Sequence, residues 1–345
     1  MIENNSKYEY IPSMGVEFIK SDVLEKLKYI NINKVIIADS NITQFHPEIL
    51  AEYNPIAIEA SENSKTLETV ITIIDELISR DAGKDTLLIG IGGGITTDIT
   101  GFVASIFKRG LKFGFIPTTL MAMADASIGG KNGVNFNGIK NLAGVIQQPS
   151  FVYIYTGFLE TLPDIHYYTA FSEIIKTGLV DNPLIIDLVE SNMQNILFKD
   201  LDAIKEILEV SIRSKQSIVT KDEFESGLRK VLNFGHTFAH AAEIASGINH
   251  GLAVAAGILI DIKLSETILD LNPGVYKRIK RIFDSLGLDY SFAVKLKIDE
   301  FALLHDKKNR QSLANITLIK DLGRPQFYNI PIEELSAFYK NVIVL

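Results

Sequence analysis

The first part of the chain alternates short apolar runs of strand length with amphipathic stretches that repeat as helices do. The apolar runs lie at 35–38, 56–59, 86–91, 113–116 and 151–155, and the clearest helical patterns lie at 66–78 and 97–107. Strands that alternate with helices are typical of βαβ units around a mostly parallel sheet. We therefore expect an α/β, Rossmann-like N-terminal domain over residues 1–157.

After about Gly157 the pattern changes to one helix after another. The helical patterns cover 165–180, 184–196, 202–220, 227–245, 252–269 and 275–286. They predict an all-α C-terminal domain over residues 158–345, and two domains suit a chain of 345 residues. Because no long linker separates the halves, we expect a cleft between them, which is a common place for a ligand.

Composition narrows the class of protein. Apolar residues make up 47% and charged residues 22%, the balance of an ordinary globular chain. A net charge of −8 argues against a nucleic-acid partner. No apolar stretch is long enough to span a bilayer, and the N-terminus lacks signal-peptide features, so we expect a cytoplasmic protein without a membrane partner. The chain has no cysteine, so any metal ion must be bound by His, Asp or Glu.

Three glycines, Gly92, Gly93 and Gly94, follow the apolar run at 86–91 and precede a helical pattern. Glycines in this position let backbone amides approach a phosphate, and the start of a helix adds a positive dipole end. The turn lacks the full GxGxxG fingerprint of dinucleotide sites. A phosphate site and a simple turn therefore both remain possible interpretations.

Residues 117–141 form a polar, glycine-rich segment. It carries Thr118, Thr119, Asp125, Lys131, Lys140 and Asn141. One interpretation is a long surface loop with solvated lysines. Long loops in compact domains are usually functional, however, and lysines among glycines suit anions. We favour an anion-binding role.

The stretch around 229–240 is the best place to look for chemistry. On a single helix, Arg229, Asn233, His236 and His240 would share one face within apolar surroundings. Polar groups there must be solvated, paired or bound to a ligand. Spacing alone allows His236 and His240 to bind one metal ion, and the alternative is ordinary hydrogen-bonded core histidines.

Two other predicted helices carry polar groups at apolar positions. Glu173 and Lys176 lie three residues apart within an apolar run, either as part of a site or as a local ion pair of small energy. Lys215 lies on the inward stripe of the pattern at 202–220, where a lysine needs a partner or must extend to solvent.

As an ordered set, these motifs resemble those of the 3-dehydroquinate synthases over roughly residues 39–308. The motifs are GGGxxxDxxGF from Gly92, KRG from Lys108, PTTL from Pro117, GGKxGxN from Gly129, KN at Lys140, SEIIK from Ser172, and LNFGHTFAHAAE followed by HGxAVAAG. The resemblance implies a dehydroquinate synthase-like fold, with an NAD-binding α/β domain and a helical domain that binds a divalent metal, Zn²⁺ or Co²⁺. It also implies a homodimer in which Arg109 reaches the neighbouring site.

The resemblance further implies roles for individual residues. Glu173, His236 and His250 would bind the metal, so that His250 takes the place that spacing gave to His240. NAD contacts would fall on Asp39, Asn41, Glu62, Lys65, Gly93, Gly94, Ile95, Asp98, Thr118, Thr119, Lys140, Phe158 and Thr161. Substrate contacts would fall on Asp125, Lys131, Asn141, Lys176, Lys215, Arg229, Asn233, His240 and either Lys307 or its neighbour, with Lys307 preferred.

The implied activity is a carbon–oxygen lyase reaction of the shikimate pathway, which leads to chorismate and the aromatic amino acids. It converts 3-deoxy-D-arabino-heptulosonate 7-phosphate to 3-dehydroquinate and phosphate, with NAD regenerated. One alternative is a sibling sugar phosphate cyclase, whose substrate lacks a carboxylate and leaves Arg229 and Lys215 without a purpose. A second is an NAD- and metal-dependent polyol dehydrogenase, which would not need the lysines of the GGK and KN motifs. A third is a non-catalytic NAD-binding protein, which would not need an intact metal triad.

Overall fold

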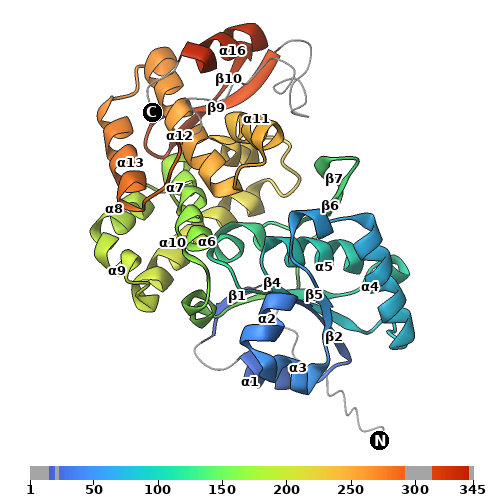
Figure 1. Ribbon diagram of the computed structural model, residues 1–345. Coiled ribbons are helices and arrows are strands. Elements are labelled where there is room, and N and C mark those ends of the chain that lie inside the picture. Colours follow the sequence, from blue (N-terminus) through green and yellow to red (C-terminus); the bar gives the residue numbers. More distant parts are fainter. Residues whose placement is uncertain (1–14, 20–22, 292–312, 342–345) are drawn as a thin grey trace, which may run out of the picture. The chain divides into compact units, whose positions relative to one another are not determined.

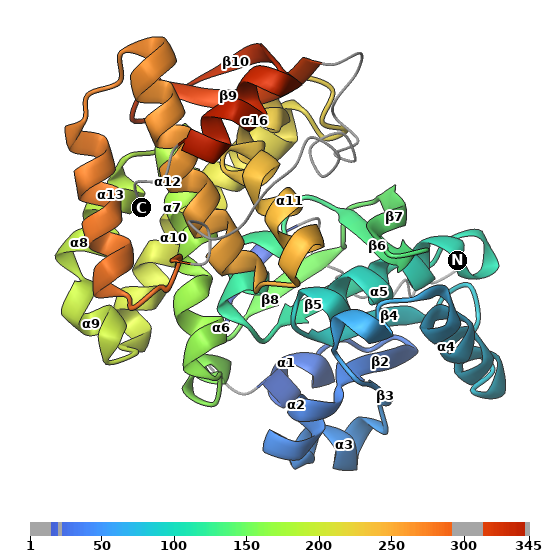
Figure 2. The same ribbon diagram turned by 45° about the horizontal axis from the view of Figure 1, so that its top comes forward.

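A computed structural model describes residues 15–19, 23–291 and 313–341. The chain divides into two compact units, Met1–Thr161 and Leu162–Leu345. Figures 1 and 2 show that the first unit contains a sheet with helices beside it, whereas the second unit consists mostly of helices.

The first unit is built on a six-stranded parallel sheet. Its strands are β1 (Gly15–Phe18), β2 (Lys34–Asp39), β3 (Ile56–Ile58), β4 (Leu87–Gly92), β5 (Phe113–Pro117) and β8 (Phe151–Ile154), in the order β1-β8-β5-β4-β2-β3. All paired neighbours run parallel. The predicted parallel sheet is confirmed, and β1 is an edge strand that the pattern did not indicate.

Helices cover both faces of this sheet. They are α1 (Val23–Lys28), α2 (Ser40–Phe45), α3 (Pro47–Tyr53), α4 (Leu67–Ser79) and α5 (Gly94–Ile106), with short turns of 3₁₀ helix at Glu62–Ser64, Phe107–Arg109 and Thr156–Glu160. In Figures 1 and 2, α1, α2 and α3 lie on one face and α5 on the other. The chain leaves β2 toward β3 and leaves β4 in the opposite direction, toward β5. The carboxyl ends of β2 and β4 therefore flank a switch point, where α/β sheets bind ligands.

The segment 117–141 is not a long loop, so that expectation is wrong. It contains a π-helical turn, Ala122–Ala126, followed by the antiparallel hairpin of β6 (Lys131–Phe136) and β7 (Ile139–Ile146). The hairpin turns at Asn137 and Gly138, which have φ of 49° and 76°. An Asn-Gly pair favours this left-handed conformation at a hairpin turn.

The second unit is mainly helical, as predicted. Its helices are α6 (Asp164–Thr169), α7 (Phe171–Val180), α8 (Leu184–Ser191), α9 (Met193–Leu197), α10 (Leu201–Lys221), α11 (His236–Ser246), α12 (His250–Leu269), α13 (Gly274–Ser285) and α16 (Ile332–Asn341). An antiparallel hairpin of β9 (Leu313–Asp321) and β10 (Arg324–Pro331), which the pattern did not predict, packs on α12. Among the described residues, no helix combines the length and apolar character needed to cross a membrane.

The single helix predicted over 227–245 is wrong. Residues Leu228–Asn233 form a 3₁₀ helix, and the chain turns before α11 begins at His236. Gly235 makes this turn in the left-handed region, with φ of 78°. Arg229 and Asn233 therefore do not share a helix face with the two histidines that follow.

Candidate active site

Three potential metal ligands from three helices converge in the second unit. Glu173 lies on α7, whereas His236 and His250 are the first residues of α11 and α12. Glu173 Oε1 lies 3.3 Å from Nε2 of each histidine. One ligand atom from each residue lies within 4.8 Å of the others. His240 does not belong to this group, although its ring centroid is 5.4 Å from that of His236.

The start of α12 is fixed by its own capping and by close packing. The side chain of Asn249 accepts hydrogen bonds from the amides of Gly251 and Leu252, at 3.0 and 3.3 Å. A Cβ on Gly251 would lie 2.3 Å from the carbonyl oxygen of Thr169, at the end of α6. Glycine at position 251 therefore allows the start of α12 to approach α6. This close contact fixes the position of His250.

Both imidazoles are oriented through their Nδ1 atoms. His236 Nδ1 lies 3.0 Å from the carbonyl oxygen of Phe234, and His250 Nδ1 lies 3.3 Å from Glu243 Oε2. In the neutral imidazole, an Nδ1–H that donates to these oxygens leaves the Nε2 lone pair facing Glu173, where a metal ion would lie between them. Metal-binding histidines are commonly held by such outer hydrogen bonds. Glu243 ends the LNFGHTFAHAAE motif, and the sequence pattern alone indicates no role for it.

The electrostatics of the cluster favour an ionised carboxylate beside a neutral imidazole. Burial by itself raises the pKa of Glu173, but the charge of Lys176 holds that pKa well below its usual value. Burial and the charge of Lys176 lower the pKa of His236 to about 4. Burial also opposes a proton on His250, yet the Glu173 and Glu243 carboxylates raise its pKa to about 10. The carboxylates of Glu173 and Glu243 thus favour a positive charge at His250.

The donor set and spacing fit a divalent ion such as zinc. Bonds of about 2.1 Å at the tetrahedral angle place neighbouring ligand atoms about 3.4 Å apart. The observed 3.3 Å between Glu173 Oε1 and each Nε2 agrees with that value. Two histidines and one glutamate are also a donor set that zinc uses in catalytic sites with a further position open.

Three other predicted residues of this unit are buried on α7, on α10 and in the 3₁₀ helix Leu228–Asn233. Lys176, Lys215 and Arg229 are 3%, 5% and 3% exposed. Lys176 makes a short ion pair with Glu173 Oε2. Arg229 Nη1 donates to the carbonyl oxygen of Glu223 at 2.6 Å. Burial of three cations is expensive unless anions or polar groups compensate it.

Asp222 organises the loop that leads to Arg229. One of its oxygens accepts the backbone N–H groups of Gly227 and Arg229, at 2.8 and 2.9 Å, and the other accepts from Ser226 at 2.9 Å. These backbone hydrogen bonds, of which the one from Arg229 has the largest effect, lower the pKa of Asp222 to about 2. In the same region Asn233 donates to Glu225 Oε1 at 2.8 Å. Sequence analysis missed Asp222, although an aspartate before a turn is a known signal for such bonding.

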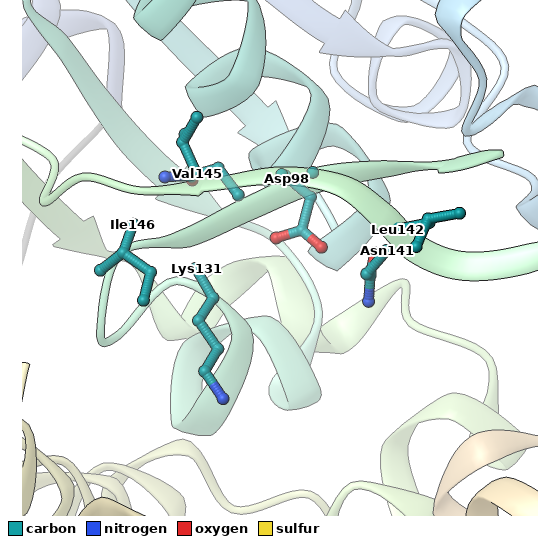
Figure 3. A pocket seen from close by; sticks show the side chains of 9 residues that line it. Asp98, Lys131, Asn141, Leu142, Val145 and Ile146 are labelled. Atoms are coloured by element: carbon teal, nitrogen blue, oxygen red, sulfur yellow. The ribbon is translucent and has the colours of Figure 1, made fainter. Parts of the chain in front are cut away.

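The first unit contains a pocket of about 290 Å³ beside the β6–β7 hairpin. It is lined by Asp98, Lys131, Asn132, Gly133, Asn141, Leu142, Gly144, Val145 and Ile146. Figure 3 shows Asp98 on α5 facing the same space as Lys131 and Asn141. Three residues predicted separately for cofactor and substrate thus line one pocket.

Lys65 ties the elements around this pocket together. Its Nζ donates to Asp98 Oδ2 at 2.5 Å and to Asn141 Oδ1 at 2.6 Å. The side chain of Asn135 joins the same network, because it donates to Glu62 Oε1 and accepts the amide of Asn141. Burial raises the pKa of Asp98, although the charge of Lys65 opposes that shift.

Most of the remaining predicted cofactor residues lie at or after the carboxyl ends of strands. Asp39 caps α2 by accepting the amide of Asn41 at 2.9 Å. Gly93 caps α5, and a Cβ on it would lie 3.1 Å from Thr119 Cγ2. The others are Gly94 and Ile95 in the first turn of α5, Thr118 after β5, Lys140 on β7, and Phe158 and Thr161 in and after the 3₁₀ turn that follows β8.

Two further predicted residues have distinct positions. Asp125 lies in the π-helical turn. Arg109 and its neighbour Lys108 are both left-handed, with φ of 67° and 47°. Non-glycine residues in that region carry backbone strain, which proteins retain mostly at functional places. Lys307 lies outside the described residues.

Comparison with known proteins places this arrangement in a family. The model of the 3-dehydroquinate synthase N-terminal domain matches residues 55–169, and the model of the C-terminal domain matches residues 170–309. The chain belongs to the 3-dehydroquinate synthase family. It is 36% identical to 3-dehydroquinate synthase of Clostridium tetani over 94% of this chain and 82% of that protein. It is 35% identical to that of Sulfolobus acidocaldarius over 93% and 94% of the two chains.

Solved structures agree with the fold. The chain superimposes with a TM-score of 0.84 on 2-epi-5-epi-valiolone synthase from Streptomyces hygroscopicus, which has NAD⁺ and Zn²⁺ bound, at 26% identity over 95% and 96% of the two chains. A 2-deoxy-scyllo-inosose synthase complexed with carbaglucose-6-phosphate, NAD⁺ and Co²⁺ matches with a TM-score of 0.84 and 22% identity, over 94% and 96%. A probable glycerol dehydrogenase from Sinorhizobium meliloti shares the fold at a TM-score of 0.64 and 13% identity, over 92% and 91%.

Proposed function

We propose that this chain is a 3-dehydroquinate synthase that acts as a carbon–oxygen lyase on 3-deoxy-D-arabino-heptulosonate 7-phosphate, with NAD and a divalent metal ion. The observation that carries the proposal is the convergence of Glu173, His236 and His250 on one point. Membership of the family supports the substrate assignment. When bound, NAD takes and returns a hydride and the metal ion acidifies a substrate hydroxyl.

Glu173, His236 and His250 would hold the metal ion, and the residues around them would keep the ligands in place. Lys176 keeps the Glu173 carboxylate ionised, and Glu243 orients His250. In the first unit, the end of β2, the start of α5 and the Lys65 network would bind NAD. The proposed NAD contacts are Asp39, Asn41, Glu62, Lys65, Gly93, Gly94, Ile95, Asp98, Thr118, Thr119, Lys140, Phe158 and Thr161.

The charges of the substrate suit the cations of this chain. The substrate carries one carboxylate and one phosphate. Arg229 suits a carboxylate because its guanidinium can donate two parallel hydrogen bonds, whereas a lysine such as Lys131 supplies a point charge. The proposed substrate contacts are Asp125, Lys131, Asn141, Lys176, Lys215, Arg229, Asn233, His240 and Lys307. We also propose that the active form is a homodimer to which Arg109 contributes.

Phosphate release from a small panel of sugar phosphates tests the proposal. With NAD and zinc, the protein should release phosphate from 3-deoxy-D-arabino-heptulosonate 7-phosphate and form 3-dehydroquinate. Glu173→Gln should abolish this activity. Glu209→Gln makes the same chemical change at a residue of α10 that pairs only with Lys205 and Arg213 among the ion pairs of the described residues, and it should leave the activity intact. Release from sedoheptulose 7-phosphate alone would make the protein a sibling cyclase. Accumulation of NADH with glycerol would make it a polyol dehydrogenase.

Arg229→Ala tests the carboxylate assignment separately. It should reduce kcat/KM for the heptulosonate substrate by about a hundredfold or more, because it leaves a bound carboxylate without its partner. The effect should be smaller for a sugar phosphate that has no carboxylate. An unchanged kcat/KM would remove Arg229 from the substrate site.

A further inference from the structure

One carboxyl group, that of Asp261, interrupts an apolar stretch of α12 in the core of the second unit. Residues 253–262 of α12 are all buried, and Asp261 is the one polar side chain among them. It is 1% exposed, and its Oδ1 atom has no hydrogen-bond partner. A helical stretch that is buried on all sides gains nothing in stability from such a group. A buried polar atom without a partner in a native core calls for an explanation.

The other oxygen of Asp261 bonds to the turn that precedes α11. Oδ2 accepts the backbone N–H of Gly235 at 2.8 Å. Gly235 has φ of 78°, and its carbonyl oxygen lies 1.9 Å from where a Cβ on Gly257 would be. The turn is thus held against α12 at two points, by a hydrogen bond to its amide and by direct backbone contact at its carbonyl.

The turn held by Asp261 is the one that orients His236. His236 follows Gly235 directly, and its Nδ1 lies 3.0 Å from the carbonyl oxygen of Phe234, on the other side of Gly235. The Gly235 amide and the Phe234 carbonyl belong to the same peptide group. A hydrogen bond to the amide therefore fixes the orientation of this peptide group. The peptide carbonyl in turn fixes the imidazole of His236, and so the direction of its Nε2 atom.

We propose that Asp261 is a positioning residue for the metal centre, which acts on His236 through the Phe234–Gly235 peptide. Its carboxylate accepts the peptide N–H, the peptide carbonyl accepts the His236 Nδ1–H, and His236 Nε2 is left to face Glu173. The inference rests on the proposed function, because it requires His236 to bind a metal ion. Burial raises the pKa of Asp261 to about 7, so an ionised carboxylate at this place carries a desolvation cost.

Cobalt titration of the full-length, chelator-treated protein tests this inference with three variants. Asp261→Asn keeps an acceptor oxygen of the same reach and should bind Co²⁺ within about twofold of the unaltered protein. Asp261→Leu has a similar size and no acceptor, and its affinity should fall about 10- to 100-fold, as for other outer hydrogen-bond partners of metal-binding histidines. Ser265→Ala is the control, because Ser265 is buried one turn further along α12 and its hydroxyl bonds the backbone of Asp261 and Ile319 but not the Phe234–Gly235 peptide.

The tautomer of His236 provides a readout that needs no metal. In the unaltered protein and in Asp261→Asn, the ¹⁵N spectrum should show a proton on Nδ1, and in Asp261→Leu a mixture of tautomers. Loss of stability in Ser265→Ala without loss of cobalt affinity would separate positioning from a general structural effect. Equal cobalt affinity in Asp261→Leu and the unaltered protein would overturn the inference and leave the metal centre standing. An unaltered protein that binds no metal would overturn the metal centre, and the inference with it.

Discussion

Replacing Asp261 by asparagine should stabilise the chain at neutral and alkaline pH. Burial raises the pKa of Asp261 from 3.8 to about 7 in the folded chain. The folded state therefore holds the proton more tightly than the unfolded state does. Ionisation of Asp261 therefore costs almost no stability below about pH 4. The cost in free energy of unfolding grows as pH rises and is complete above about pH 7. A difference of about three pH units at about 1.4 kcal/mol each gives a cost of about 4 kcal/mol.

Urea unfolding of the metal-free protein at about pH 5 and about pH 8 measures this cost. At the lower pH the carboxyl group should cost about 1 to 2 kcal/mol, so the advantage of Asp261→Asn should grow by about 3 kcal/mol between the two conditions. Taking the difference between the two proteins cancels the titration of all other groups. An advantage that stays the same at both values of pH would show that Asp261 does not ionise at an unusual pKa, and would refute the reasoning.

Three other substitutions test separate parts of the structure. Glu243→Gln should weaken Co²⁺ binding about 10- to 100-fold in a metal titration, and an unchanged affinity would deprive Glu243 of its role in orienting a ligand. Gly257→Ala should destabilise the fold by at least about 2 kcal/mol in urea, because its Cβ would lie 1.9 Å from a backbone oxygen. Gly83→Ala, with no atom within 4 Å of its Cβ, should stay within about 0.5 kcal/mol, and similar results for the two would contradict the packing argument. Lys65→Met should weaken NAD binding about tenfold or more in calorimetry, because it leaves the partly buried Asp98 carboxylate without its cation, whereas unaltered NAD affinity would remove the Lys65 network from the cofactor site.

Sequence pattern predicted the sheet because buried parallel strands leave a strong local signal. The runs at 86–91 and 113–116 are β4 and β5 within one or two residues, and the glycines after β4 lie at the start of α5. An isolated pattern could not decide what those glycines bind. The order of motifs along the chain carried that information, through the resemblance to a family.

The turn at Gly235 could not be predicted from the same kind of pattern. The helical repeat continues across it, so spacing paired His236 with His240 and placed Arg229 on their helix. What breaks the helix is tertiary: the backbone of Gly235 packs on α12, and a distant carboxyl group, Asp261, takes its amide. Contacts between residues far apart in sequence leave no trace in local periodicity, and for that reason His250 also could not be chosen as a ligand from spacing.

The central claim is that Glu173, His236 and His250 bind one divalent ion on which synthase activity depends. Zinc titration of the chelator-treated protein, followed by 3-dehydroquinate formation at saturating NAD, tests it most directly. Activity should rise in proportion to added zinc and level off at about one ion per chain, with no rise in a Glu173→Gln protein. Full turnover in the presence of the chelator, or an unaltered zinc response in that variant, would contradict the account.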